Sequence, residues 1–269
     1  MSSIQTSVLT PAHAWTTTSG RVLGTRFELA IDGDSSLIDL ALDRFRRLEA
    51  ALSRLLPMSE LNRLNARPGQ DVPVSDDLGC ALREAVRLRL VTGGRFDPSI
   101  LPTSEGLGLV LGDDDTARLN HGTRLDLSGI EAGLAIDAVV EALIDAGVRA
   151  VRLRVGDTFR AVGPDQWTIE VAHPATGEIV THQTLTDRSL TAVVTPRLGP
   201  YATTPYAGAS DQSTVVSLAV VACSRATDAQ GAAQAAVASS PGGANALMTR
   251  LAVDAWLLTP VGVVVVRSS

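Results

Sequence analysis

Two short segments, about thirty residues apart, carry side chains suited to binding a polar ligand. In residues 93–99 two glycines shortly precede Asp97, and in residues 125–137 glycines follow Asp126. Glycine adopts turn conformations that other residues avoid, and it lets a ligand approach the main chain closely. Each segment therefore combines a permissive turn with a carboxylate flanked by apolar residues, an arrangement suited to a flat ligand with polar edges.

Both carboxylates also have a purely structural explanation. Asp97, directly after the double glycine and Phe96, can close an Asx-type turn that fastens the loop to the core. Asp126 precedes Gly129 at an expected strand-to-helix junction, where free backbone N–H groups face an arriving anion. Asp126 or Ser128 can equally cap that helix.

A third carboxylate, Asp228, lies at another expected helix start after a strand. A carboxylate and a neighbouring hydroxyl, here that of Thr227, are hard oxygen ligands of the kind that Mg²⁺ prefers. The simpler alternative is that one of these two residues is an ordinary N-cap.

Composition excludes several classes of function. The net charge of −6 gives no basic footprint for nucleic acid or anionic lipid. All 23 basic residues are Arg, which removes Schiff-base, P-loop and kinase lysines. The four histidines lack metal-ligand spacing, and neither a GxSxG elbow nor a GxGxxG turn after a strand occurs.

The chain has no targeting or membrane pattern by sequence. No charged start is followed by an apolar run, and no stretch reaches the length of a membrane span. We therefore expect a cytoplasmic protein without membrane insertion. Residues 1–20, rich in Ser and Thr, are expected to form a flexible arm or an edge segment, and residues 21–269 a single domain.

The hydrophobic periodicity predicts an α+β fold with a mixed or antiparallel sheet, because short strands separated by Gly/Pro turns alternate with amphipathic helices. The expected helices span residues 36–55, 76–91, 129–146 and 227–238, with a short one ending at 251. The expected strands span residues 21–31, 148–155, 167–172, 190–194, 214–223, 253–258 and 261–266. The acidic run at 113–122 is expected to be a solvated loop.

Taken in order, these segments resemble the ApbE-type FAD:protein FMN transferases. The matching stretches extend from about residue 21 to the end of the chain: Leu23-Gly24-Thr25, Ser59-Glu60-Leu61-Asn62, Thr92-Gly93-Gly94-Arg95-Phe96-Asp97-Pro98-Ser99, Asp126-Leu127-Ser128-Gly129-Ile130, Gly133-Leu134-Ala135-Ile136-Asp137, Val155-Gly156-Asp157 and Ala226-Thr227-Asp228. Each stretch is moderately specific alone, and their shared order is what makes the resemblance specific.

The resemblance implies two closely joined lobes with flanking helices, in a T-fold-related, ApbE-like architecture. It further implies FAD between the lobes, Mg²⁺ near its pyrophosphate, and transfer of FMN to a threonine of an acceptor protein with release of AMP. The residues implied at the flavin are Leu23, Arg95, Phe96, Asp97 and Asp126, together with Ala132 at a cofactor-contacting position. The main chain of Gly129 and the carboxylate of Asp228 are implied at the metal, and Asp228 carries the catalytic role.

Four departures from the family pattern leave a second hypothesis open. Ala132 replaces a Lys or Glu, Met58 replaces an Asp, and Ala232 stands where a metal-binding Thr is expected. Residues 195–213 contain no counterpart of a His-containing segment. Losing one electrostatic contributor to such a reaction can cost roughly 10²- to 10³-fold in rate. The chain is therefore either an active transferase or a degenerate homologue that serves as a flavin-binding or protein-interaction module.

Overall fold

The structure is a computed structural model that describes residues 4–8, 15–100, 107–173, 176–177, 179–195 and 216–268. The segment without the family's histidine motif, residues 195–213, lies almost entirely outside the described residues.

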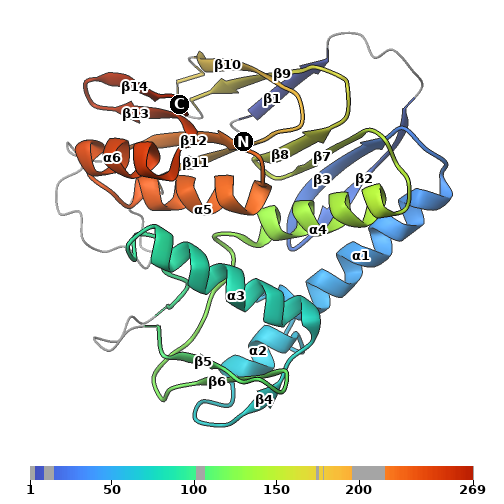
Figure 1. The fold of residues 1–269 in the computed structure, drawn as a ribbon, viewed down its shortest axis with the longest axis vertical. Helices are drawn as coiled ribbons and strands as arrows, with labels where there is room; N and C mark the ends of the chain where they lie inside the picture. Colours follow the sequence, from blue (N-terminus) through green and yellow to red (C-terminus); the bar gives the residue numbers. More distant parts are fainter. Residues whose placement is uncertain are drawn as a thin grey trace.

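An antiparallel sheet of eight strands organises the fold (Figure 1). Its order is β14-β13-β12-β11-β8-β7-β3-β2, and every neighbouring pair is antiparallel. The strands are β2 (Thr16–Val22), β3 (Thr25–Ile31), β7 (Val151–Val155), β8 (Thr158–Val162), β11 (Ser189–Val194), β12 (Leu218–Cys223), β13 (Asp254–Thr259) and β14 (Gly262–Val266). The prediction of an α+β fold with an antiparallel sheet is confirmed.

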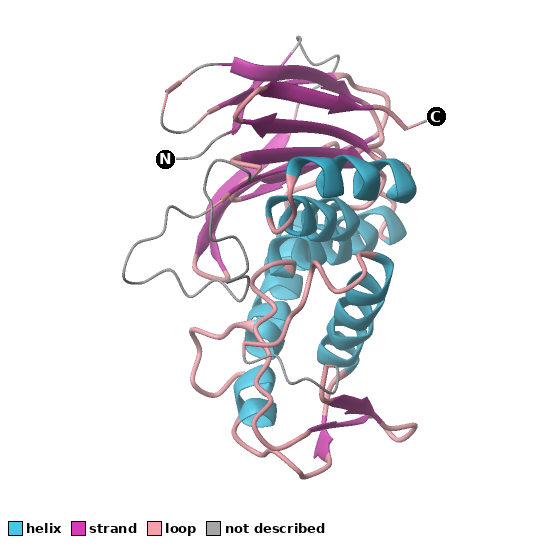
Figure 2. Cartoon of the chain, turned by 90° about the vertical axis from the view of Figure 1, so that its left-hand side faces the viewer, coloured by secondary structure: helices cyan, strands magenta, loops and turns pink. Residues whose placement is uncertain are grey.

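Helices cover one face of this sheet and extend away from it (Figure 2). They are α1 (Ser36–Leu52), α2 (Glu60–Asn65), α3 (Asp76–Val91), α4 (Glu131–Asp145), α5 (Ala226–Val237) and α6 (Pro241–Leu251). Helix α5 packs on β11 and β12, and α4 packs on β7 and against both α1 and α5. Because α4 is enclosed in this way, it is apolar around most of its circumference. Among the described residues, no helix has the length and apolarity needed to cross a membrane.

Two small sheets complete the chain. The sheet β1-β9-β10 consists of β1 (Ile4–Val8), β9 (Trp167–Ala172) and β10 (Ile179–Leu185), and a second core with Trp167, Phe159 and Trp256 includes residues of this sheet and of the large one. The sheet β4-β6-β5 consists of β4 (Val72–Pro73), β5 (Leu109–Leu111) and β6 (Thr116–Leu119), at the far end of the helices (Figure 2).

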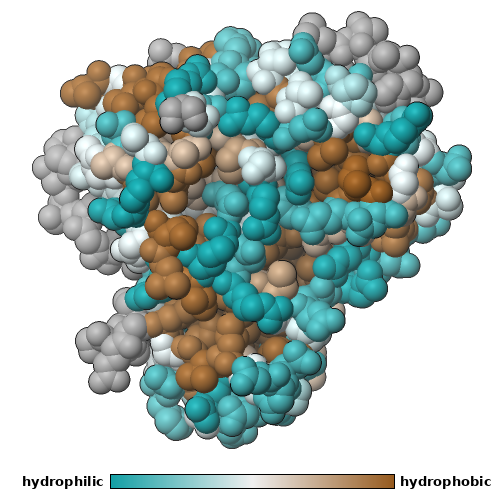
Figure 3. All heavy atoms as spheres, in the orientation of Figure 1, coloured by the Kyte–Doolittle hydropathy of each residue, from teal (hydrophilic) through white to brown (hydrophobic). Residues whose placement is uncertain are grey.

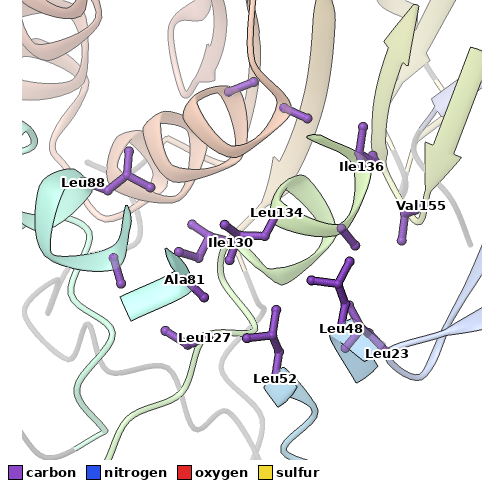
Figure 4. Packing of buried hydrophobic residues seen from close by; sticks show 14 of the residues in the cluster. Leu23, Leu48, Leu52, Ala81, Leu88, Leu127, Ile130, Leu134, Ile136 and Val155 are labelled. Carbon is purple, nitrogen blue, oxygen red and sulfur yellow. The ribbon is translucent and has the colours of Figure 1, made fainter. Parts of the chain in front are cut away.

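The main core lies where α1, α3 and α4 meet. Figure 4 shows Leu48 and Leu52 of α1, Ala81 and Leu88 of α3, and Ile130 at the start of α4 within one cluster. Burial of each leucine or isoleucine side chain in this cluster contributes about 1.5 to 3 kcal/mol to stability. This cluster fixes the start of α4, and with it the position of residues 125–137, the second segment singled out by sequence.

Three local predictions were wrong. Residues 21–31 form a hairpin rather than one strand, since the chain reverses at Leu23 and Gly24, both with positive φ. Helix α1 ends at Leu52, before Leu55, which is exposed. The expected loop at 113–122 contains β6, which is paired with both β4 and β5.

Candidate functional site

The two segments singled out by sequence are joined in space. The amide of Asp126 donates to the carbonyl of Pro98 at 2.8 Å, and Ser99 pairs with Leu125 in an isolated antiparallel bridge. The ring of Phe96 lies against Gly129, since a Cβ at that glycine would be 3.2 Å from the ring. The short pairing fixes both turns together at the start of α4.

Asp97 is held by protein groups. One carboxylate oxygen accepts a hydrogen bond of 2.9 Å from Nε of Arg89, and the other accepts from the amide and the hydroxyl of Ser99 at 2.9 and 2.7 Å. This is the loop-fastening arrangement that the sequence left open as an alternative. Asp97 therefore shapes the turn that presents Phe96.

Asp126 belongs to an acidic neighbourhood. Its carboxylate accepts from the amide of Ser128 at 2.9 Å and lies 3.6 Å from Nε of Arg54. Burial, followed by the negative charge of Asp126, raises the pKa of Glu131 in the first turn of α4 to about 7, while Arg54 opposes the shift and Glu49 adds to it. Glu131 was not predicted from sequence as a site residue, although it lies beside Ala132, between two of the matched stretches.

Leu23 approaches the same neighbourhood through the main chain. It is buried with a φ of 52°, and its amide donates to Oε1 of Glu49 at 2.9 Å. Positive φ is costly for a residue with a branched side chain, so the turn is held by this hydrogen bond and by burial. Since the charges of Glu49 and Asp126 both act on Glu131, the Leu23 turn belongs to the same acidic neighbourhood as Asp126.

Replacing Glu131 by Gln should stabilise the protein at high pH. The raised pKa means that the folded state disfavours the ionised carboxyl, so stability is greatest below pH 4.5 and falls as the pH rises to about 7. Glu131→Gln removes this penalty, and we expect a gain of about 2 kcal/mol at pH 8 and little change at pH 4.5. Thermal unfolding at the two pH values measures the difference, with the exposed Glu141→Gln on the same helix as the control. An equal effect at both pH values would contradict the assignment.

Two main-chain amides at the start of α4 have no acceptor among the described residues. Ile130, the N-cap residue, makes no side-chain capping bond. The Gly133 amide donates to Oε1 of Gln230 at 2.7 Å, whereas the amides of Gly129 and Ala132 have no acceptor in the described part of the chain. Unpaired amides and the helix dipole favour an anion at this end.

Helix α5 begins at a buried carboxylate supplied by α4. Asp137 accepts from the amides of Ala226 and Thr227 at 2.9 Å each, from the Thr227 hydroxyl at 2.7 Å, and from Arg160 at 2.5 Å. Gly133 lies one turn before Asp137 and allows α4 to touch the main chain of Ala226. The capping role of Asp137 was not predicted from sequence, although its spacing of four residues from Gly133 places both on one face.

Asp228 lies in the first turn of α5, on a pocket of about 330 Å³ between α3, α5 and the end of α6. Its carboxylate is bonded to Arg87 of α3, which also binds Glu84 at 2.7 Å. Arg188 lines the same pocket and is held by Asp254 at 2.7 Å. The apolar wall consists of Leu88, Val91, Ala232, Leu251 and Val253. Figure 3 shows apolar surface close to the end of α3. Neither arginine was predicted as a site residue.

The residues around Asp228 do not fit a divalent cation. A hard cation such as Mg²⁺ takes about six oxygen ligands. Here the carboxylate already binds a guanidinium, and the side chain of Ala232, one turn along, offers no oxygen. Among the residues that the structure describes, no group of three or more His, Cys, Asp or Glu side chains could hold a metal ion. Burial raises the pKa of the Cys223 thiol in the same pocket to about 12, so it is neutral at pH 7.

Three further predicted site residues, Gly129, Arg95 and Ala132, have contacts other than Asp228. Gly129 faces Gln234, more than a turn further along α5, and the exposed Arg95 reaches toward Gly243 in the first turn of α6. Ala132 is half-buried and packs against the main core. The structure therefore brings Phe96, Asp97, Asp126 and Gly129 together and leaves Asp228 with a separate set of partners.

Comparison with known proteins agrees with this architecture. The crystal structure of the flavinyl transferase ApbE of Pseudomonas stutzeri matches with a TM-score of 0.80 over 95% of each chain, at 19% identity. The flavin transferase ApbE of Vibrio cholerae gives 0.78 over 95% of this chain and 97% of that one, at 19% identity. The ApbE protein of Thermotoga maritima gives 0.77 over 95% and 97%, at 16% identity. At these identities the likeness shows the fold.

Sequence comparison places the chain in one family. The FAD:protein FMN transferase of Haemophilus influenzae is 25% identical over a match that covers 59% of this chain and 58% of that protein. The family model described as "ApbE family" matches residues 23–117 and 106–257, which together span most of the chain. The chain belongs to the ApbE family.

Proposed function

We propose that this protein binds FAD where residues 93–99 and 125–137 meet, and that it transfers FMN from FAD to a threonine of an acceptor protein. The observation that carries the proposal is the junction of these segments at the start of α4, where Phe96 packs on Gly129 and the amides of Gly129 and Ala132 have no acceptor among the described residues. A relative that is 25% identical bears the name of this activity.

The proposed division of roles follows from the chemistry of each group. The Leu23 turn, Phe96 and the Asp97 loop would border the flat flavin, and Asp126 would accept hydrogen bonds from its polar edge. The amides at the start of α4 would face the pyrophosphate, since this helix end favours anions. Arg95, exposed near the start of α6, would meet the outer part of the ligand.

The proposed reaction is a phosphoryl transfer. The threonine hydroxyl attacks the phosphorus of the FMN half, a new phosphoester bond forms, the anhydride bond to AMP breaks, and the hydroxyl proton is released. Such transfers need alignment and neutralisation of charge more than a protein nucleophile. The donor set at Asp228 does not support the predicted dependence on Mg²⁺, so no step is assigned to a metal.

A second candidate function is FAD binding without transfer. It is favoured by the bonding of Asp228, the residue predicted to be catalytic, to Arg87, and by the absence of side-chain oxygens at Ala132 and Ala232. In this case the protein would be a flavin-binding module built on the transferase fold.

Replacing Asp126 by Asn is expected to weaken FAD binding about tenfold, the usual effect of losing one hydrogen bond to a charged group. Titration of the protein with FAD, followed by flavin fluorescence, measures the affinity. Asp145→Asn, an exposed change at the end of α4, is the control and should leave it unaltered. Equal affinity of both variants would remove Asp126 from the site.

Incubation with FAD and a threonine-containing acceptor, read by mass spectrometry, separates the two functions. Addition of FMN to the acceptor with release of AMP supports the transferase. Saturable FAD binding without transfer to an acceptor validated with another family member supports the module. Failure of the wild-type protein to bind FAD overturns both.

A further inference from the structure

We infer that the guanidinium of Arg87 takes the place of a divalent cation at Asp228, so that a phosphate group in this pocket is met by arginine instead of metal. The inference goes beyond the proposed function, because the Asp228 pocket is separate from the start of α4, where the pyrophosphate of FAD is proposed to lie; the ligand inferred here is the diphosphate group of a nucleotide such as ADP.

Arg87 is held by two carboxylates, those of Glu84 and Asp228, and it lines the pocket. Its Nε and one terminal nitrogen donate to Oε2 of Glu84 at 2.9 and 2.7 Å, and the same terminal nitrogen binds Asp228. The second terminal nitrogen, Nη1, has no partner in the described residues, and the side chain is 40% exposed. The guanidinium therefore keeps N–H donors available to a ligand while its orientation is fixed.

The charged groups around Arg87 form one network. Arg225 binds Glu84 at 3.1 Å and lies 3.8 Å from Asp137, so the same carboxylates that hold Arg87 are tied to the start of α5. Burial alone would lower the pKa of Arg87, but the hydrogen bonds and charges of Glu84 and Asp228 raise it. The cation is therefore permanent at any working pH, as a bound metal ion would be.

A metal ion at Asp228 would have to displace this arginine. It would meet one carboxylate, the positive charge of Arg87 and the methyl group of Ala232. The guanidinium instead satisfies the carboxylate with a charge-assisted hydrogen bond and matches the shape of a phosphate. Arg188, which is 37% exposed on the same pocket, supplies a second cation of this type.

The statement that no divalent cation binds at Asp228 is tested without any nucleotide. Titration with Mn²⁺, followed by electron paramagnetic resonance, should show no site that depends on Asp228, so the wild-type protein and Asp228→Asn should give the same curve. A single Mn²⁺ bound by the wild-type protein and lost in Asp228→Asn would overturn the inference, whether or not FAD binds.

The statement that Arg87 binds a phosphate group is tested with ADP as the probe. Its affinity should be the same in Mg²⁺ and in EDTA, and should fall about tenfold or more in Arg87→Met, since a charge-assisted contact is lost. Arg83→Met, one turn earlier on α3 and exposed, is the matched control and should bind as the wild-type protein does. Arg87→Lys, which keeps the charge, should be intermediate and serves if Arg87→Met does not fold.

Two outcomes would contradict phosphate binding by Arg87: ADP binding that requires Mg²⁺, or an equal loss of ADP affinity in the Arg83 and Arg87 variants. If ADP does not bind at all, phosphate binding by Arg87 is likewise wrong, and the FAD titration decides separately whether the proposed function stands.

Discussion

Replacing Asp137 by Asn is expected to lower the free energy of unfolding by about 3 to 5 kcal/mol, as is typical when one partner of a buried ion pair is removed. Asp137 is 3% exposed, and its two oxygens accept from two amides, one hydroxyl and Arg160. Asparagine keeps one acceptor but turns an NH₂ group toward these donors. It also leaves Arg160, whose side chain is 16% exposed, without its counter-charge.

Urea unfolding followed by circular dichroism measures the loss, and Asp145→Asn, on the same helix but exposed, should change it by less than about 0.5 kcal/mol. Because Asp137 holds the start of α5, we also expect the Arg87–Asp228 pair to shift and ADP affinity to fall with it. A fully stable Asp137→Asn variant would show that the cap is not what fixes α5.

Helices and strands whose first and last residues are set by neighbouring residues in the chain were predicted correctly from the sequence. Helix α3 begins and ends where predicted, at Asp76 and Val91, because acidic residues favour its first turn and Gly93 and Gly94 stop it. The alternation of apolar residues likewise predicted β7, β9 and β11 closely.

Elements that depend on distant partners were not predicted. The hairpin at Leu23 requires positive φ at a leucine, which only the Glu49 hydrogen bond and burial make tolerable. Strand β6 is stabilised by neighbours on both sides, β4 and β5, while its own acidic surroundings are typical of a loop.

The same limit applies to the site. The ordered motifs singled out residues 93–99 and 125–137, since both carry their own turn signals, and the structure shows that the two segments are paired. The partner of Asp228 is 141 positions away in the chain, and the donors that Asp137 binds on α5 are 89 and 90 away. Nothing in local spacing relates such residues, so a carboxylate expected to bind a metal is found in an ion pair.

Replacing Gly133 by Ala is expected to lower the free energy of unfolding by about 3 kcal/mol, the upper part of the usual range for overpacking. A Cβ here would lie 2.6 Å from the carbonyl oxygen of Ala226 and 2.7 Å from Cα of Thr227. Both are main-chain atoms and cannot rotate away, so α4 and α5 must separate, and the hydrogen bond from Gly133 to Gln230 must lengthen.

Two further glycines on helices calibrate this effect in the same urea unfolding experiment. At Gly231 a Cβ would lie 2.7 Å from Cδ1 of Leu88, a side chain that can adjust in part, so Gly231→Ala should be less destabilising than Gly133→Ala. At Gly242 the added Cβ meets open space, and Ala should gain up to about 0.5 to 1 kcal/mol from its higher helix propensity. The three variants are therefore expected to differ in their free energy of unfolding according to the atom that the new methyl group contacts: main chain, side chain or solvent. If Gly133→Ala were as stable as Gly242→Ala, close main-chain packing of α4 on α5 could not be what holds Asp228 in its place.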